Sequence, residues 1–206
     1  DEEGVAAAVA DARADHVFHL AAHGGYSWQT DHGAILRSIV IGTANLLEAC
    51  LACDFGTFVN TGSSSEYGLK DHAPNEAEAL EPNSMYAVAK AAATMMCRQA
   101  AVRGDANICT LRLYSTYGPW EEPRRLVPAL VLEGLRGRLP PLVDSTVARD
   151  FVWVGDVVDA FLLAARAVHK EPGAVYNVGT GVQTTLAEAV ASVCAVLDVK
   201  ALPDWG

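Results

Sequence analysis

Short apolar runs alternate with longer stretches of helical periodicity along the chain, and this alternation constrains the fold more than any other feature of the sequence. It predicts strands at 16–20, 56–61, 107–113, about 149–154 and 174–177. It predicts helices at 3–14, 34–53, about 84–103, about 123–136, 156–168 and 184–197. Strands that alternate with helices form βαβ units, so we expect an α/β protein with a doubly wound, mostly parallel sheet.

The composition is that of a folded protein and excludes several classes of partner. The 206 residues are 51% hydrophobic, and 25 acidic side chains against 15 Lys plus Arg give a net charge of −10. Surfaces that bind nucleic acid or anionic membranes need clustered Lys and Arg, so we expect neither partner. No apolar run approaches the roughly 18–20 residues of a membrane span, and no secretory leader opens the chain.

The cysteines are scattered and odd in number: Cys50, Cys53, Cys97, Cys109 and Cys194. Such a set does not make a disulfide framework, which favours a reducing compartment and a cytoplasmic location. Cys50 and Cys53 have the CxxC spacing that occurs in redox and zinc sites. The pair ends a helical pattern and no second CxxC follows, so packing on a helix face is the favoured interpretation.

Histidines near the first predicted strand raise the question of a metal site: His16, His19, His23 and His32. His16 and His19 are three apart in a strand, so they face opposite sides of the sheet. No carboxylate cluster completes a ligand set, and we therefore expect no metal.

Ligands of doubly wound sheets bind at the carboxyl ends of the strands, so the residues directly after each strand are the candidates for function. Strand 16–20 is followed by Ala21, Ala22, His23 and two glycines. Small residues there let a flat ligand approach the backbone closely, although a tight turn explains them equally well.

The strand at 56–61 is followed by 62–67, with the sequence GSSSEY. Three consecutive hydroxyls at the carboxyl end of a strand are unusual for a core and suggest contact with a polar ligand. A Ser-rich turn is the alternative interpretation.

The strongest chemical signal is the pair Tyr86 and Lys90. Ser84 is a suitable N-cap, so the two side chains stand at positions i and i+4 on one face of a helix. A nearby ammonium lowers the pKa of a phenol, which then can exchange a proton with a substrate hydroxyl near neutral pH. An accidental surface pair is the alternative, but the preceding strand that ends in serines favours the chemical interpretation.

Eight segments follow one another in the order of a known family's motifs: HVFHLAA, GTANLLEA, TGSSSEYG, YAVAK, LRLYSTYGP, RLVPAL, RDFVWVGDVVDAFLLA and YNVGTG. They run from about Ala14 to Leu197. The chain resembles the extended short-chain dehydrogenase/reductases, in particular the NAD-dependent nucleotide-sugar epimerase/dehydratase group. The resemblance implies a Rossmann-like fold with a small C-terminal substrate-binding region.

The resemblance also implies roles for individual residues. Tyr86 would be the acid/base and Lys90 would bind the nicotinamide ribose. Ser63 would be the assisting hydroxyl, with Ser64 and Ser65 as the fallback if the loop is shifted. The positions matching the site of the cofactor, NAD with NADP not excluded, are Ala21, Ala22, His23, Thr61, Gly62, Tyr86, Lys90, Leu113 and Tyr114. The positions matching the nucleotide-sugar site are Ser63, Ser65, Ser115, Arg125, Leu126, Leu142 and Arg149. A simple ion pair with Asp150 is the alternative for Arg149.

Three departures from the family pattern qualify these roles. The glycine-rich fingerprint GxxGxxG is absent, and the first residues resemble the region just beyond it, so we expect the first βαβ unit to lie outside this sequence. The dehydratases of the family carry an acidic residue one or two places after the assisting hydroxyl, where this chain has Ser64 and Ser65. Glu66 comes one place too late, which argues against a dehydratase. Ile39 stands where the family often has Asn.

The resemblance implies a division into residues 1–118, the remaining part of the dinucleotide-binding domain, and residues 119–206, a substrate-binding lobe that returns to the core sheet at 155–180. The favoured function is an NAD-dependent epimerase, or a related ketoreductase, acting on a nucleotide-activated sugar. A dehydratase or decarboxylase of the same group, and a non-catalytic Rossmann-like binding protein, are the alternatives. A homodimer formed through helices 34–53 and 84–103 is also implied.

Overall fold

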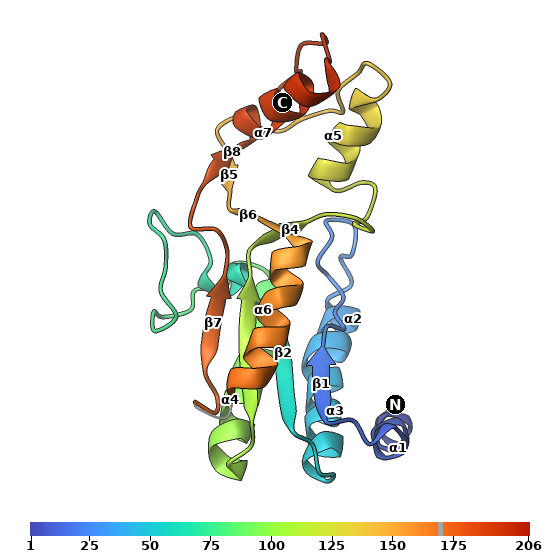
Figure 1. Ribbon diagram of the computed structural model, residues 1–206, viewed down its shortest axis with the longest axis vertical. Helices are drawn as coiled ribbons and strands as arrows, with labels where there is room; N and C mark the ends of the chain where they lie inside the picture. Colours follow the sequence, from blue (N-terminus) through green and yellow to red (C-terminus); the bar gives the residue numbers. More distant parts are fainter. Residues whose placement is uncertain (169–170) are drawn as a thin grey trace. The chain divides into compact units, whose positions relative to one another are not determined.

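A parallel four-stranded sheet forms the centre of the first of two compact units in the computed structural model, which describes residues 1–168 and 171–206. Its strand order is β1-β2-β3-β7, with bounds His16–His19, Thr57–Ser63, Ile108–Leu113 and Val175–Val178 (Figure 1). This unit comprises Asp1–Leu113 and Asp159–Val178. The α/β fold with a mostly parallel sheet is confirmed.

The two inner strands are largely buried because helices cover both faces of the sheet. Phe58 and Val59 of β2 and Ile108 of β3 are fully buried, which explains the continuous apolar runs in the sequence. The helix α4 (Met85–Gly104) packs on β2 and β3 from one face. The helix α6 (Val154–Ala167) crosses the opposite face (Figure 1).

The predicted helix 34–53 is a continuous helical stretch with a change of winding in its middle. It consists of α2 (His32–Leu36), the π-turn η1 (Arg37–Ile41) and α3 (Gly42–Leu51). Asp31 caps its start by accepting a hydrogen bond from the backbone N–H of Ala34 at 3.0 Å. The preceding helix α1 (Glu2–Ala12) packs against α3. The apolar period predicts the helix but not the π-turn.

Within the described residues, one helix is long and apolar enough to cross a membrane. It is the stretch His32–Leu51, twenty residues with a mean hydropathy of 1.5, and it corrects the expectation that no segment reaches this length. The core helix of a folded domain passes the same test. Here Ile35, Ile39 and Leu47 are buried within unit 1, so one side of the helix packs in the core, while 33% of its most apolar 18-residue window is buried in all.

The second unit comprises Tyr114–Val158 and Gly179–Gly206. Its strands form two short pairs, β4 (Ser115–Tyr117) with β6 (Phe151–Trp153), and β5 (Ala148–Arg149) with β8 (Thr184–Thr185). Its helices α5 (Leu126–Gly134) and α7 (Leu186–Leu197) enclose a core of Leu130, Leu142 and Val190. Strands of two or three residues are too short to produce a readable period, so β4, β5 and β8 were not predicted.

The helix α5 begins three residues later than the sequence suggests. The prediction started it at Pro123, whereas Arg125 is the N-cap and Leu126 the first helical residue. Pro128 stands third in the helix, where its missing N–H costs nothing because the first four N–H groups have no partner within a helix.

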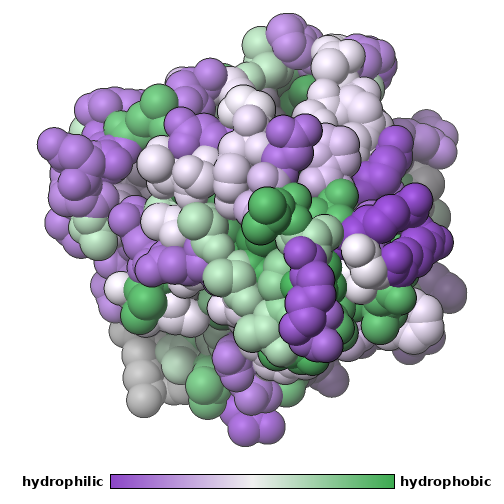
Figure 2. All heavy atoms as spheres, turned by 90° about the horizontal axis from the view of Figure 1, so that it is seen from above, coloured by the Kyte–Doolittle hydropathy of each residue, from purple (hydrophilic) through white to green (hydrophobic). Residues whose placement is uncertain are grey.

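Apolar residues also gather on the surface. One contiguous apolar area lies in the face shown in Figure 2, and its margins are mostly polar. The large exposed apolar residues of the described chain include Leu69, Trp120, Val196 and Leu202. Contiguous apolar surface is typical of faces that contact a ligand or another protein surface.

The turn after Tyr67 requires glycine. Gly68 has φ +74°, and a methyl group there would lie 2.0 Å from the carbonyl oxygen of Glu81. This close approach ties the end of the serine-rich segment to the loop that leads into α4. Gly173 also has a positive φ, +81°, but a methyl group there meets its neighbours only at 3.4 Å.

Gly68→Ala should therefore destabilise the protein more than Gly173→Ala. The second substitution introduces only the backbone strain of a left-handed residue, about 1–2 kcal/mol. The first adds a collision with backbone that cannot move aside. Urea unfolding of both variants checks the difference, and equal losses of stability would show that the loop from Gly68 to Glu81 yields easily.

Candidate functional site

The serine-rich segment forms a tight corner at the carboxyl end of β2. Ser63 ends the strand, and the short 3₁₀ helix η2 (Ser64–Tyr67) begins directly after it. The Ser63 hydroxyl accepts a hydrogen bond from the Ser65 N–H at 3.2 Å and lies 2.7 Å from the Ser65 hydroxyl. The backbone N–H of Ser63 donates to Oε1 of Glu66 at 2.8 Å, which completes a capping box. Local hydrogen bonds thus hold Ser63 at the strand end.

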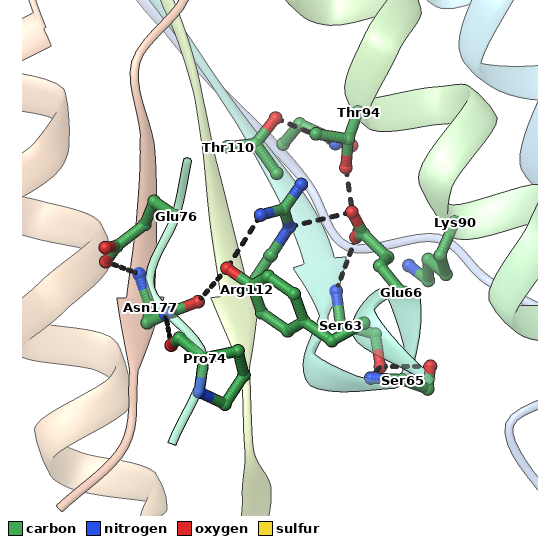
Figure 3. Close-up of polar contacts among 12 residues, drawn as sticks. Ser63, Ser65, Glu66, Pro74, Glu76, Lys90, Thr94, Thr110, Arg112 and Asn177 are labelled. Carbon is green, nitrogen blue, oxygen red and sulfur yellow. Dashed lines mark hydrogen bonds and ion pairs between the residues drawn. The ribbon is translucent and has the colours of Figure 1, made fainter. Parts of the chain in front are cut away.

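Glu66 turns inward from this corner and is fully buried. Its Oε2 accepts a hydrogen bond from Nε of Arg112 at 2.8 Å, and its Oε1 accepts one from the Thr94 hydroxyl at 3.0 Å (Figure 3). Arg112 also donates to the Tyr67 hydroxyl at 2.7 Å, and that hydroxyl donates to Oδ1 of Asn177 at 2.8 Å. A polar network therefore joins the corner to α4, β3 and β7.

Sequence reasoning missed this network. From the sequence, Glu66 was considered only as an acidic residue one place beyond the positions where the dehydratases carry an acid. A usable signal was present in NICTLRL, where Arg112 stands in an otherwise buried strand, because a buried guanidinium needs a carboxylate partner. The sequence did not show which carboxylate that is.

Gly62 is required by the same network. A methyl group there would lie 2.7 Å from Oε1 of Glu66 and 2.8 Å from Cγ2 of Thr110. The glycine thus makes room for the buried carboxylate under the strand.

The helix α4 brings Tyr86 and Lys90 to the corner. Ser84 caps it by accepting a hydrogen bond from the Ala87 N–H at 3.2 Å, as the sequence predicts. Lys90 is only 3% exposed, and its Nζ donates to the carbonyl oxygen of Thr61 at 2.8 Å. The same Nζ lies 5.9 Å from the centre of the Tyr86 ring. The predicted pair is therefore brought together with the carboxyl end of β2.

Tyr86 is half-buried, and its hydroxyl end faces a glycine. A methyl group at Gly25 would lie 3.9 Å from the Tyr86 hydroxyl oxygen. The small residues after β1 thus lie close to the phenol.

Burial controls the ionisation of the two basic groups beside this corner. Removal from water lowers the pKa of Lys90 to about 8, and the charge of Glu66 acts in the opposite direction. Burial and the charge of Lys90 lower the pKa of His19 to about 4, so this imidazole is neutral at pH 7. Nε2 of His19 lies 2.9 Å from the Thr43 hydroxyl. Lys90 is therefore the one of the two that carries charge near neutral pH.

The other residues expected around the cofactor lie at the ends of β1, β2 and β3. Ala21 and Ala22 are exposed, and Nδ1 of His23 is 3.3 Å from the Gln29 amide. The Thr61 hydroxyl is buried without a hydrogen-bond partner among the described residues. Leu113 is the last residue of β3.

The remaining candidate residues belong to the second unit: Tyr114, Ser115, Arg125, Leu126, Leu142 and Arg149. Arg125 pairs with Oε1 of Glu121 at 3.2 Å, and Leu142 is buried in the core between α5 and α7. Nη1 of Arg149 donates to the Ala148 carbonyl at 2.8 Å.

Asp150 has partners other than the neighbouring arginine. Its carboxylate accepts hydrogen bonds from the backbone N–H groups of Thr180 and Gly181 at 2.9 and 2.8 Å. These hydrogen bonds hold the Asp150 carboxylate in place, so the ion pair with Arg149, the alternative that the sequence suggested, is not needed to account for its position.

The cysteines are packed as thiols. All five lie in the described part of the chain and are free, and Cys50 and Cys97 belong to the core between α3, α4 and the sheet. Burial raises the pKa of Cys97 to about 12 and that of Cys109 to about 11, which removes their nucleophilic character. No group of three or more His, Cys, Asp or Glu in the described ranges is placed to hold a metal ion.

The pattern of a known family covers most of the chain. The family described as "NAD dependent epimerase/dehydratase family" matches residues 1–179. A dTDP-glucose 4,6-dehydratase of Streptomyces antibioticus is 32% identical over 179 residues, which are 84% of this chain and 52% of that protein. UDP-glucuronate 4-epimerase 2 of Arabidopsis thaliana is 28% identical over 205 residues, 90% of this chain and 47% of that protein.

Solved structures agree with the sequence matches. The UDP-glucuronic acid 4-epimerase of Bacillus cereus, solved with UDP-glucuronic acid and NAD, superposes with a TM-score of 0.89 at 26% identity. The match covers 100% of this chain and 66% of that structure. The chain spans about half the length of the curated relatives that it matches.

His19 makes the stability of the protein depend on pH. Its pKa is about 4 in the folded state against 6.5 ordinarily, so between these values the unfolded chain binds a proton that the folded protein does not. The contribution of His19 to the free energy of unfolding is fully present above pH 6.5. It is lost as the pH decreases toward 4, by up to about 3 kcal/mol. Denaturant unfolding from pH 7 to pH 4.5 should show a shallower decline for His19→Gln. His32→Gln, at an exposed position, should keep the wild-type slope, and an unchanged slope in His19→Gln would contradict the assignment.

Proposed function

Because the chain belongs to the NAD-dependent epimerase/dehydratase family, we propose that it forms the catalytic part of an NAD-dependent epimerase, or a related ketoreductase, acting on a nucleotide-activated sugar. The observation that carries this proposal is the convergence of Tyr86, Lys90 and Ser63 at the carboxyl end of β2. These are the side chains that proton transfer at a sugar hydroxyl requires.

Tyr86 takes the proton from a sugar hydroxyl and later returns it. The ammonium of Lys90 favours the phenolate because the two groups are close and water is largely excluded from the amine. The Ser63 hydroxyl holds the reacting oxygen, with Ser64 as the alternative partner. The protein contributes positioning and electrostatics.

The residues at the strand ends fit a dinucleotide. The Thr61 hydroxyl, which has no hydrogen-bond partner in the described part of the chain, is a buried polar atom that a ligand can satisfy, and the exposed Ala21 and Ala22 keep the backbone accessible. Lys90 would bind the nicotinamide ribose, with His23, Leu113 and Tyr114 completing the lining. NAD, when bound, supplies the acceptor and donor of hydride. We propose NAD as the cofactor, with NADP as the alternative.

The second unit supplies the substrate-binding residues in this proposal. Arg125 and Arg149 are suited to a diphosphate because a guanidinium donates several hydrogen bonds in one plane. Ser115 and Leu126, together with Ser65 of the first unit, match other positions of the nucleotide-sugar site, whereas Leu142 is buried in the core between α5 and α7 and packs there instead.

The position of Glu66 favours an epimerase over a dehydratase. Loss of water from a sugar needs an acid and a base at adjacent carbons, so it needs a carboxyl group near the assisting hydroxyl. The nearest acid in the sequence is Glu66, and it is buried and bonded to Arg112, Thr94 and the Ser63 backbone. Ser64 and Ser65 occupy the positions where the dehydratases carry acids.

Tyr86→Phe should reduce turnover by at least about 100-fold, the usual contribution of a general acid–base group. Binding of NAD should persist because the phenyl ring keeps its place. The measurement is product formation by the intact protein with UDP-, dTDP-, GDP- and CDP-sugars, together with a fluorescence titration of the nucleotide. Tyr176→Phe, on the outer strand β7, is the matched control and should retain turnover.

Unchanged turnover in Tyr86→Phe would refute the assignment of the acid/base. A 4-keto-6-deoxy product would establish the dehydratase instead. Binding of a sugar nucleotide without any change in nicotinamide fluorescence would favour a non-catalytic binding protein.

We also propose that the protein is a cytoplasmic homodimer formed through the helical layer of α2–α3 and α4. The free thiols support a reducing compartment. Val88, Met95 and Val102 of α4 are exposed and seven residues apart, which places them in one stripe along the helix. Such a stripe suits packing against the same helix of a second copy.

Met95→Glu should convert the dimer into a monomer, because it places a charge in the centre of the stripe. Sedimentation velocity of the intact protein measures the change. Leu69→Glu, at an exposed residue outside the helical layer, should leave the sedimentation coefficient unchanged. A dimer that survives Met95→Glu would show that a different surface is used.

A further inference from the structure

We propose that Glu66 is a positioning residue of the site, whose buried carboxylate supplies the negative charge that keeps Lys90 an ammonium beside Tyr86. The inference rests on the proposed function for the role of Tyr86 and Lys90. It assigns a role to a residue that the acid/base chemistry itself does not use.

The carboxylate of Glu66 is held in place from three elements. Its Oε1 accepts hydrogen bonds from the Ser63 N–H at the end of β2 and from the Thr94 hydroxyl on α4. Its Oε2 accepts one from Nε of Arg112 on β3. With 0% exposure, the group cannot exchange these partners for water. Its charge therefore stays at one location.

Lys90 lies one helical turn before Thr94, which donates to this carboxylate, and its Nζ bonds the carbonyl of Thr61, two residues before Ser63, whose N–H donates to the same carboxylate (Figure 3). The amine has a hydrogen bond to a neutral carbonyl, that of Thr61, and is 3% exposed. A neutral acceptor alone does not offset the loss of hydration of an ammonium, so a second source of negative potential is needed. Glu66 is that source, and its charge opposes the effect of burial on the pKa of Lys90.

The other titratable groups that face Lys90 do not provide this charge. Tyr86 is the group on which the ammonium acts, so its phenolate is the result of that charge and not the source of it. Burial raises the pKa of Cys97 on the same helix, so that the thiol is neutral at pH 7. His19 of β1 is neutral as well. Arg112 of β3 is a cation, so its charge disfavours protonation of Lys90. Among these groups, Glu66 is thus the one that can supply negative charge next to the two buried cations.

A structural role alone predicts something different. If Glu66 only anchored the corner, removing any one of its hydrogen bonds would weaken the fold and leave the ionisation of Lys90 unchanged. Charge and hydrogen bonding can be separated because Thr94 contacts the same Oε1 without carrying charge.

The test measures the pH at which Lys90 loses its proton, by NMR of the lysine ε-methylene groups in the intact protein without substrate. The sequence has four lysines, so Lys90→Arg identifies the signal. Glu66→Gln should lower the titration midpoint by about one pH unit or more, the effect of removing a nearby opposite charge. Thr94→Val is the matched control and should keep the wild-type midpoint. The double variant Glu66→Gln/Arg112→Met removes both charges and should have a midpoint above that of Glu66→Gln alone.

If Glu66→Gln does not fold, the double variant carries the test, because it leaves no unpaired guanidinium. In that case the double variant is compared with Arg112→Met alone, and its midpoint should be the lower of the two, because the two variants differ only in the charge at position 66. An unchanged midpoint in Glu66→Gln, or an equal shift in Thr94→Val, would overturn the proposal.

The activity profile gives an independent readout. Because turnover needs the ammonium, the alkaline limb of kcat should move to lower pH in Glu66→Gln by the same shift as the NMR midpoint, with KM nearly constant. Absence of turnover with every sugar nucleotide in the wild type would contradict the proposed function while leaving the NMR result to decide the role of Glu66. A shifted midpoint with an unshifted kcat limb would show that Lys90 does not act through its charge.

Discussion

A carboxylate that is shut off from water and paired with a buried arginine is the constraint on which the arrangement of this site depends. The buried carboxylate of Glu66 is held in place because Arg112, Thr94 and the Ser63 N–H all donate to it. These donors come from β3, α4 and the end of β2. The position of the serine corner relative to the helix that carries Lys90 therefore follows from one set of hydrogen bonds.

This arrangement has an energetic consequence for the whole sheet. A buried ion pair gains little over apolar packing, but loss of one partner leaves an uncompensated charge that is strongly destabilising. Arg112 extends the network through the Tyr67 hydroxyl to Asn177 on β7, and Asn177 in turn donates to the Pro74 carbonyl at 3.0 Å (Figure 3). The loop before α4 is thus tied to the outer strand by polar contacts rather than by apolar packing.

The sequence was a good guide wherever a local rule applies. Apolar periods located β2, β3 and α4 to within two residues, because burial on two faces or on one stripe leaves a clear pattern. The Ser84 cap and the i, i+4 pair of Tyr86 and Lys90 were read correctly for the same reason. The π-turn at Arg37–Ile41 was missed because the period of the helix hardly changes across a single wide turn.

By itself, the sequence determined the alternation of strands and helices, the caps, and the fact that one phenol and one amine share a helix face, since each depends on residues close together in the chain. Only the tertiary structure decided that Glu66 lies buried against Arg112, a residue 46 positions further along, and that the serine corner meets Lys90. The physical reason is that the charge state of a buried group depends on everything packed around it. That environment is assembled from distant segments only when the sheet closes.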